Sequence, residues 1–478
     1  MGSWSTTHRR RGGAPWVVAF GLVVLLVAGV TPRATAASPT TYTGSFPDGA
    51  TYLIQVPEDW NGTLVLYSHG IVLPGNPNPA RDVGDPLTGQ YLLGHGYALA
   101  GSSYAATGWA VQEALQDQIA TLDTFDRLVG RHPIRTVAWG HSLGGMITAG
   151  LLQRYPDRFA GALPMCGVVG GAVGTWNQAL DSAFAFRRLL APTSALQLVH
   201  ISDPELNLHV ARQALAAAQA TPAGQARIAL VAALADLPGW FVPGSPEPAP
   251  ADYDAQEADQ FRWLAQVGVV LGFAERAEVE ARAGGNPSWN TGVNYQKQLE
   301  QSADEAEVHG LYAQAGLSLD ADLATLQAAP RIAADPGAVD YLRRNIVFDG
   351  QLHGRPVLTL HTTGDGFVVN QNEQAYRKVV QDAKDAQLLR QAFVHRAGHC
   401  TFTPAETIAA FQTLIDRIDA SKWTASTDPG ALNDRASALD PTLNVLSIGG
   451  NLVPTPPEYL DYQPTVFLRP YDLRFQAG

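Results

Sequence analysis

The sequence predicts an α/β fold, in which a mostly parallel sheet is flanked by helices and interrupted by a large, mainly helical insertion. Three observations favour this class. An apolar run, Ile134 to Trp139, leads through a glycine-rich turn into a stretch of helical period. Two strand-like runs toward the C-terminal end each lead into a turn with an ionisable side chain. Between these parts lies an alanine-rich region with apolar residues three or four apart, which is typical of helices.

The glycine-rich turn, residues 140–145, has the sequence GHSLGG. A Gly-x-Ser-x-Gly between a strand and a helix makes so tight a turn that glycines must flank the serine, and its hydroxyl is left exposed above the sheet. The pentapeptide also occurs by chance in unrelated proteins, so the residues around it decide between a catalytic and a structural role for the serine. Here Val137 precedes it, and Met146, Ile147 and Leu151 follow at helical spacing. We therefore interpret Ser142 as a nucleophile rather than as a helix-capping serine.

A serine hydroxyl needs a base to take its proton and an acid to orient that base. A buried-type strand ends in a turn that carries Asp365, and the next strand-like run is followed by His399. We expect these two residues to be the acid and the base. His395 is the rival base, but it lies within the last strand residues, and His361 lies inside the strand before Asp365, where we expect a packed histidine.

With these motifs and the Ser68-His69-Gly70 turn, the chain resembles the α/β-hydrolase superfamily over roughly residues 40–170 and 351–424. It looks like a secreted serine hydrolase with a large helical cap, of the bacterial esterase or tripeptidyl-aminopeptidase type. The resemblance implies acyl transfer: the serine attacks, the histidine accepts and returns the proton, and the aspartate holds the imidazole in the right tautomer.

The resemblance also implies an oxyanion hole, the pair of backbone N–H groups that stabilises the tetrahedral intermediate. A strand-like run, residues 62–68, ends in His69-Gly70. In similar hydrolases the residue after this glycine supplies one N–H and the residue after the nucleophile supplies the other. These residues are Ile71 and Leu143 in this chain, and we expect His69 to brace the loop.

The sequence contains two cysteines, Cys166 and Cys400. Cys166 ends the strand after the nucleophile helix, and Cys400 directly follows the proposed base. In this topology the histidine loop returns past the end of that strand, so we expect a disulfide that fixes His399; two buried free thiols are the alternative. Zinc is disfavoured because no further cysteine or spaced histidine pair accompanies them, and no cofactor is expected.

The N-terminal segment has the pattern of a secretory signal peptide, residues 1–36. Arginines 9–11 precede an uncharged apolar stretch, Trp16 to Val30, and Ala34-Thr35-Ala36 offers a cleavage site. An uncleaved anchor is the alternative. After cleavage we expect a secreted chain without a stable membrane span. It keeps 28 basic and 44 acidic residues, a net charge of −16, which disfavours nucleic acid and anionic membranes as partners.

The remaining sequence suggests a division into parts. We expect the hydrolase core at residues 37–170 and 351–424, a helical cap at 171–350, and a proline-broken extended arm, packed on the core, at 425–478. Tyr104 and Trp109 are candidates for the substrate pocket, because the strand before them should end beside Ser142. Aromatic residues of the cap either line this pocket or form the cap's own core; they are Trp176, Trp240, Phe241, Trp263 and Trp289.

Several functions are compatible with these features. The expected substrate is a small-molecule ester or a peptide, and the first hypothesis is hydrolysis of carboxylic esters. The second is an aminopeptidase, which needs cap carboxylates facing the serine to hold a free amine; Glu257 and Glu305 are candidates. Acyl transfer to an alcohol and a catalytically idle binding protein are further alternatives, although the triad positions are intact.

Overall fold

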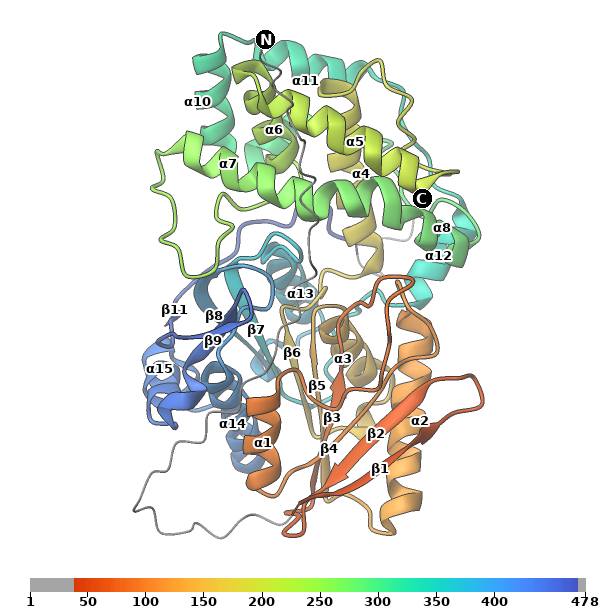
Figure 1. The fold of residues 1–478 in the computed structure, drawn as a ribbon, viewed down its shortest axis with the longest axis vertical. Coiled ribbons are helices and arrows are strands. Elements are labelled where there is room, and N and C mark those ends of the chain that lie inside the picture. Colours follow the sequence, from red (N-terminus) through yellow and green to blue (C-terminus); the bar gives the residue numbers. More distant parts are fainter. Residues whose placement is uncertain (1–37, 472–478) are drawn as a thin grey trace, which may run out of the picture. The chain divides into compact units, whose positions relative to one another are not determined.

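A computed structural model describes residues 38–471 of the chain (Figure 1). The predicted signal peptide and its cleavage site, residues 1–36, lie outside the described residues. Among the residues that are described, no helix combines the length and the apolar character needed to cross a bilayer.

The described chain is built on one nine-stranded sheet with the order β1-β2-β4-β3-β5-β6-β7-β8-β11. The strands β3 to β8 pair in parallel, whereas β1, β2 and β11 add antiparallel pairs at the two edges. The mostly parallel sheet expected from the sequence is therefore confirmed. Its strands are β1 (Thr40–Ser45), β2 (Thr51–Val56), β3 (Thr63–Ser68), β4 (Ala98–Ser102), β5 (Arg135–His141), β6 (Gly161–Met165), β7 (Val357–Gly364), β8 (Leu389–Ala397) and β11 (Tyr459–Leu460).

Helices cover both faces of this sheet, which is why its central strands are apolar on both sides. Alternate residues of β3 show the two faces. Leu64 and Leu66 pack in the cluster that includes α2 (Val111–Val129) and α3 (Leu143–Arg154). Val65 and Tyr67 pack in the cluster that includes α1 (Pro86–Gly94) and α14 (Pro404–Ala420). The helix α13 (Gln371–Asp382) contributes to the first of these clusters.

Between β6 and β7 the chain forms a layer of helices with its own apolar cluster (Figure 1). The alanine-rich helix α6 lies at its centre, because residues 228–233 are all buried. The layer consists of α4 (Ala172–Leu189), α5 (Pro204–Gln219), α6 (Pro222–Ala233), α7 (Tyr253–Trp263), α8 (Arg276–Ala283), α9 (Tyr295–Gln301), α10 (Glu305–Ala315), α11 (Leu319–Ala328) and α12 (Pro336–Arg344). We call these residues the helical layer.

The C-terminal segment is more regular than its prolines suggested. Residues 429–437 form α15 (Pro429–Ser437), since a proline is compatible with the first turn of a helix. A small hairpin follows, made of β9 (Val445–Ile448) and β10 (Asn451–Pro454). The strand of this segment that pairs with β8 is β11, at residues 459–460.

Beyond β11 the tail reaches the helical layer. The Phe467 side chain is fully buried in the apolar cluster of that layer. Arg469 forms an ion pair with the buried carboxylate of Asp181 on α4, and it donates to the carbonyl oxygen of Trp289 over 2.8 Å. The tail therefore connects the sheet edge, which it extends through β11, with the helical layer.

This connection can be tested at Phe467. We expect Phe467→Ala to lower the free energy of unfolding by about 3–5 kcal/mol, because the change empties a fully buried site. Urea denaturation followed by circular dichroism measures the effect. Val466→Ala is the matched control, since that side chain is 43% exposed. Equal stability of the two variants would contradict the packing described for the tail.

Candidate active site

The turn between β5 and α3 holds Ser142 in a conformation that few residues adopt. Its φ is 60° and its ψ is −125°. The flanking glycines are required by space: a Cβ on Gly140 would lie 2.4 Å from the Gly144 carbonyl oxygen, and a Cβ on Gly144 would lie 1.9 Å from the Ser68 carbonyl oxygen. The turn is therefore as tight as the sequence predicted, and it holds Ser142 in a strained backbone conformation.

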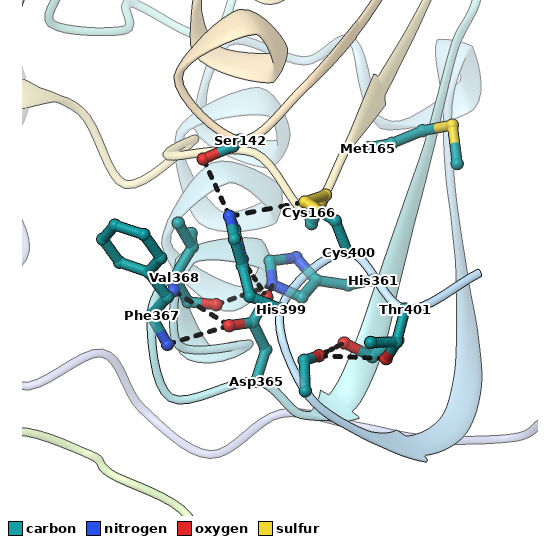
Figure 2. Close-up of a disulfide and its surroundings, with 12 residues drawn as sticks. Ser142, Met165, Cys166, His361, Asp365, Phe367, Val368, His399, Cys400 and Thr401 are labelled. Atoms are coloured by element: carbon teal, nitrogen blue, oxygen red, sulfur yellow. Dashed lines mark hydrogen bonds and ion pairs between the residues drawn. A yellow bond between two sulfur atoms is a disulfide. The ribbon is translucent and has the colours of Figure 1, made fainter. Parts of the chain in front are cut away.

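Three side chains from distant parts of the sequence meet at this turn (Figure 2). The Ser142 hydroxyl donates to His399 Nε2 over 2.8 Å, and His399 Nδ1 donates to Asp365 Oδ2 over 2.8 Å. Asp365 follows β7 and His399 follows β8, so the carboxyl ends of parallel strands bring the three side chains together. His395 lies apart from them, because it is bound to Glu247 over 2.8 Å.

The Asp365 carboxylate is fully buried, and its charge is compensated from several directions. Its Oδ1 accepts hydrogen bonds from the backbone N–H groups of Phe367 (2.9 Å) and Val368 (3.0 Å). Burial alone would raise the pKa of this carboxyl group, but the charges and hydrogen bonds of His399 and His361 outweigh burial and lower the pKa to about 2. Asp365 is thus ionised over the whole working pH range of proteins.

The sequence suggested a packed His361, and the structure shows a further interaction of this buried side chain. Its Nδ1 lies 3.1 Å from Glu373 Oε1, and its Nε2 lies 2.8 Å from the Val368 carbonyl oxygen and 3.5 Å from Asp365 Oδ2. Both ring nitrogens face acceptors, so both carry protons. Burial alone would lower the pKa of His361, but hydrogen bonds to Asp365 and Glu373 raise it to about 10.

Glu373 is a residue that sequence reasoning missed. It lies on α13, is fully buried, and accepts hydrogen bonds from Thr359 and Gln391, each over 2.6 Å. The sequence around Glu373 gave no signal of this role, because the residues that donate hydrogen bonds to it come from β7 and β8.

The proposed oxyanion donors lie beside the serine. A Cβ on Gly70 would be 3.2 Å from Ser142 Cβ, so this glycine permits the close approach of the loop. Leu143 is the first residue of α3, and the N–H groups of a first helical turn have no partner within the helix. The side chains of Ile71 and Leu143 both line the pocket next to Ser142.

His69 and Tyr104 support this loop from behind. Their rings stack at a centroid distance of 4.0 Å, and the Tyr104 hydroxyl donates to the His69 carbonyl oxygen over 3.0 Å. Tyr104, which the sequence suggested for the substrate pocket, lies outside the residues that line it. Its positive φ of 62° turns the chain away after β4, and the ring packs under the loop instead.

The disulfide between Cys166 and Cys400 is present, so the alternative of two free thiols is not observed. Their Cα atoms are 5.4 Å apart, although 234 residues separate them in sequence. Cys166 lies at the end of β6 and Cys400 directly follows His399, whose Nε2 is 3.4 Å from the Cys400 sulfur (Figure 2). The bond therefore attaches the histidine loop to the strand next to the elbow.

A pocket of about 90 Å³, measured by the centres of water-sized spheres, opens at Ser142. The core contributes Ile71, Trp109 and the 366–369 turn, whereas the helical layer contributes α4 and the segment after α7. Among the described residues that line this pocket, none is charged. Trp109 and Trp176 meet edge to face on its wall, with ring centroids 5.4 Å apart.

The other aromatic residues that the sequence suggested for the pocket pack elsewhere. A Cβ on Gly366 would lie 2.3 Å from the Trp263 ring, and a Cβ on Gly364 would lie 3.0 Å from Trp240. These two tryptophans therefore pack on the turn that carries Asp365. Phe241 packs against Trp263 and Trp289 packs against Tyr471.

Known proteins resemble this chain in sequence or in chain course. No protein-family model matches the sequence. Solved structures with a similar chain course include an esterase from Aspergillus oryzae (12% identity, TM-score 0.40, 80% of each chain covered) and an acylaminoacyl peptidase from Pyrococcus horikoshii (12% identity, TM-score 0.34, 77% of this chain and 38% of that chain). The sheet order and the position of Ser142 between β5 and α3 are those of the α/β-hydrolase fold.

A known protein with a similar sequence identifies the family of the chain. The chain is 31% identical to o-phthalyl amidase of Xanthobacter agilis over 424 residues, which cover 83% of this chain and 90% of that protein. The chain belongs to the family of this amidase.

The disulfide can be tested by substitution of both cysteines. We expect Cys166→Ala/Cys400→Ala to lower the free energy of unfolding by about 2–5 kcal/mol, because the bond constrains a long loop of the unfolded chain. Denaturation of the oxidised protein and of the double variant measures the difference. Reducing agent should destabilise the wild type and leave the double variant unchanged, and insensitivity of both would contradict the bond.

The charge interaction between His361 and Asp365 can be tested by the pH dependence of activity and stability. A carboxyl group whose pKa is lowered on folding contributes stability above its unfolded pKa, and this contribution is lost as the pH falls toward about 2. His361→Gln removes a positive neighbour of Asp365, so we expect the acid side of the kcat/KM profile, and the onset of acid unfolding, to move to higher pH. His353→Gln, at an exposed histidine, is the control. Coincident profiles would contradict the assignment.

Proposed function

We propose that the protein is a serine hydrolase that cleaves an acyl bond through a covalent intermediate on Ser142. The observation that carries this proposal is the continuous chain of hydrogen bonds from Ser142 through His399 to Asp365. A serine so arranged is activated by the imidazole, and a buried carboxylate orients that imidazole and stabilises its charged form.

In the first half of the proposed reaction, Ser142 Oγ attacks the substrate carbonyl carbon while His399 Nε2 takes the hydroxyl proton. The carbonyl oxygen becomes an oxyanion, which accepts hydrogen bonds from the backbone N–H groups of Ile71 and Leu143. His399 then gives the proton to the leaving nitrogen or oxygen, and the acyl group remains on Ser142 as an ester.

In the second half, water takes the place of the leaving group. His399 accepts a proton from the water as it attacks the acyl-enzyme, and it returns that proton to Ser142 Oγ when the acid product leaves. The hydrogen bond from Nδ1 to Asp365 keeps Nε2 turned toward the serine throughout. Each cycle therefore leaves the three side chains unchanged.

The acyl group that we propose is that of an aromatic carboxylic acid, joined to its leaving group as an amide or an ester. Two observations support it: the family relative is an o-phthalyl amidase, and the pocket beside Ser142 is lined by uncharged, largely apolar and aromatic side chains. Esters of this acid should react in addition to its amides, because the same acyl-enzyme forms from either.

The aminopeptidase alternative has less support. A carboxylate would have to face the serine to hold a free amine, but neither candidate lines the pocket. Glu257 is buried and accepts a hydrogen bond from Gln219, and burial raises its pKa to about 7. The Glu305 side chain is 44% exposed and lies near His309.

We further propose that the helical layer acts as the cap of the site, and that the protein is exported with residues 1–36 as its signal peptide. The cap assignment, residues 171–350, is supported by the pocket wall that α4 and the segment after α7 supply. Export is supported by the disulfide, since such bonds persist mainly in oxidising compartments.

The proposed nucleophile is tested by labelling with a fluorophosphonate probe. We expect wild-type protein and the exposed-site control Ser447→Ala to be labelled, whereas Ser142→Ala is not. Hydrolysis of benzoyl and 2-carboxybenzoyl anilides should fall roughly a millionfold in kcat for Ser142→Ala. An aminoacyl anilide tests the peptidase alternative in the same assay. Labelling that survives in Ser142→Ala would contradict the proposal.

A further inference from the structure

The wall of the pocket opposite the core has an unusual backbone. The helix that begins with α7 does not continue as a regular α-helix into α8 but passes through two π-helical turns, Leu264–Gly268 and Leu271–Glu275. In the first of them the Val269 N–H donates to the carbonyl oxygen of Leu264, five residues earlier. Such turns hold an extra residue and are frequent at functional sites.

The part of this segment that faces the pocket lies in and between the two turns. Val267, Gly268 and Leu271 line the pocket; Val267 and Gly268 are adjacent, and Leu271 lies about one helical turn further on. The neighbouring Gln266 is exposed and lies outside the lining. The irregular helix therefore presents a small residue, Gly268, between two apolar ones toward Ser142.

Gly268 leaves the pocket wall without a side chain at this position. The three heavy atoms nearest to a Cβ built there all belong to Leu264, the closest at 2.8 Å and the others at 3.8 Å. The closest of these, Leu264 Cδ2, is the end of a flexible side chain. Backbone strain does not require the glycine either, since its φ lies outside the left-handed region. Larger residues are thus compatible with the backbone if the end of the Leu264 side chain shifts, and they would add volume at a residue that lines the pocket.

The rest of the lining suits a planar ring. Trp109 and Trp176 form one aromatic wall, and Phe367 stands beside His399 with ring centroids 4.8 Å apart. The volume of about 90 Å³ is several times the roughly 10–15 Å³ that one water molecule needs. Aromatic rings pack favourably edge to face or offset against such walls.

We infer that Gly268 in the π-helical wall sets the size of the acyl group, and that the space it leaves accommodates the aromatic ring of the acid. This inference rests on the proposed function and specifies its acyl pocket. A ring in the space beside Gly268 would share one pocket with Ser142, because both residues line it.

The test fills the space in steps. Gly268→Ala, Gly268→Val and Gly268→Phe are compared with the matched control Gln266→Phe, which adds the same ring to the outer side of the same turn. The measured quantity is kcat/KM for p-nitrophenyl benzoate divided by kcat/KM for p-nitrophenyl acetate. We expect this ratio to fall about tenfold or more in Gly268→Phe and by less in the smaller variants. It should stay within about twofold in Gln266→Phe.

A thermal melt of each variant identifies any that do not fold, and the graded series keeps the test decisive if Gly268→Phe is lost. A ratio that is unchanged in Gly268→Val and Gly268→Phe, or that falls equally in the control, would overturn the inference. If wild type hydrolyses neither ester, the proposed function fails by itself. Binding of benzamide, measured by calorimetry, then tests the acyl pocket without catalysis. Binding should be lost in Gly268→Phe and retained in Gln266→Phe, and equal binding to both would refute the inference.

Discussion

The charge of the Asp365 carboxylate, held without any exposure to water, is the constraint to which the surrounding structure is fitted. An ion in this position is stable only when it is paired and hydrogen-bonded. Two backbone N–H groups, the His399 ring and the charged His361 ring provide that compensation. Glu373 in turn balances His361, so the ionic cluster extends from the proposed nucleophile to α13 behind the sheet.

The same turn connects the site to the helical layer. Trp263 lies on Gly366, one residue after Asp365, and Trp263 Nε1 donates to the Trp240 carbonyl oxygen over 2.9 Å. Trp263 is also the last residue of α7, directly before the first π-helical turn of the pocket wall. The element that anchors the acid turn and the element that shapes the pocket are therefore parts of one continuous helix.

The sequence predicted those features that depend on local constraints. The elbow was visible because only glycines fit beside Ser142, and the acid and base turns were visible because each follows a buried-type strand. Features that depend on long-range packing were not visible. Glu373 acquires its role from β7 and β8, the π-helical turns show no distinctive residue pattern, and Tyr104 is turned under the loop by its positive φ. The helix α15 was missed because its prolines suggested an extended chain.

The disulfide has a consequence for how such a protein can diversify. The covalent ring that it closes contains the entire helical layer, β7 and the acid turn, and its two ends lie beside the elbow and at His399. Insertions, deletions and exchanged helices inside the ring leave the separation of its ends fixed, and the entropic cost of a longer loop grows only slowly. Evolution can therefore vary the helical layer while Ser142 and His399 stay in register.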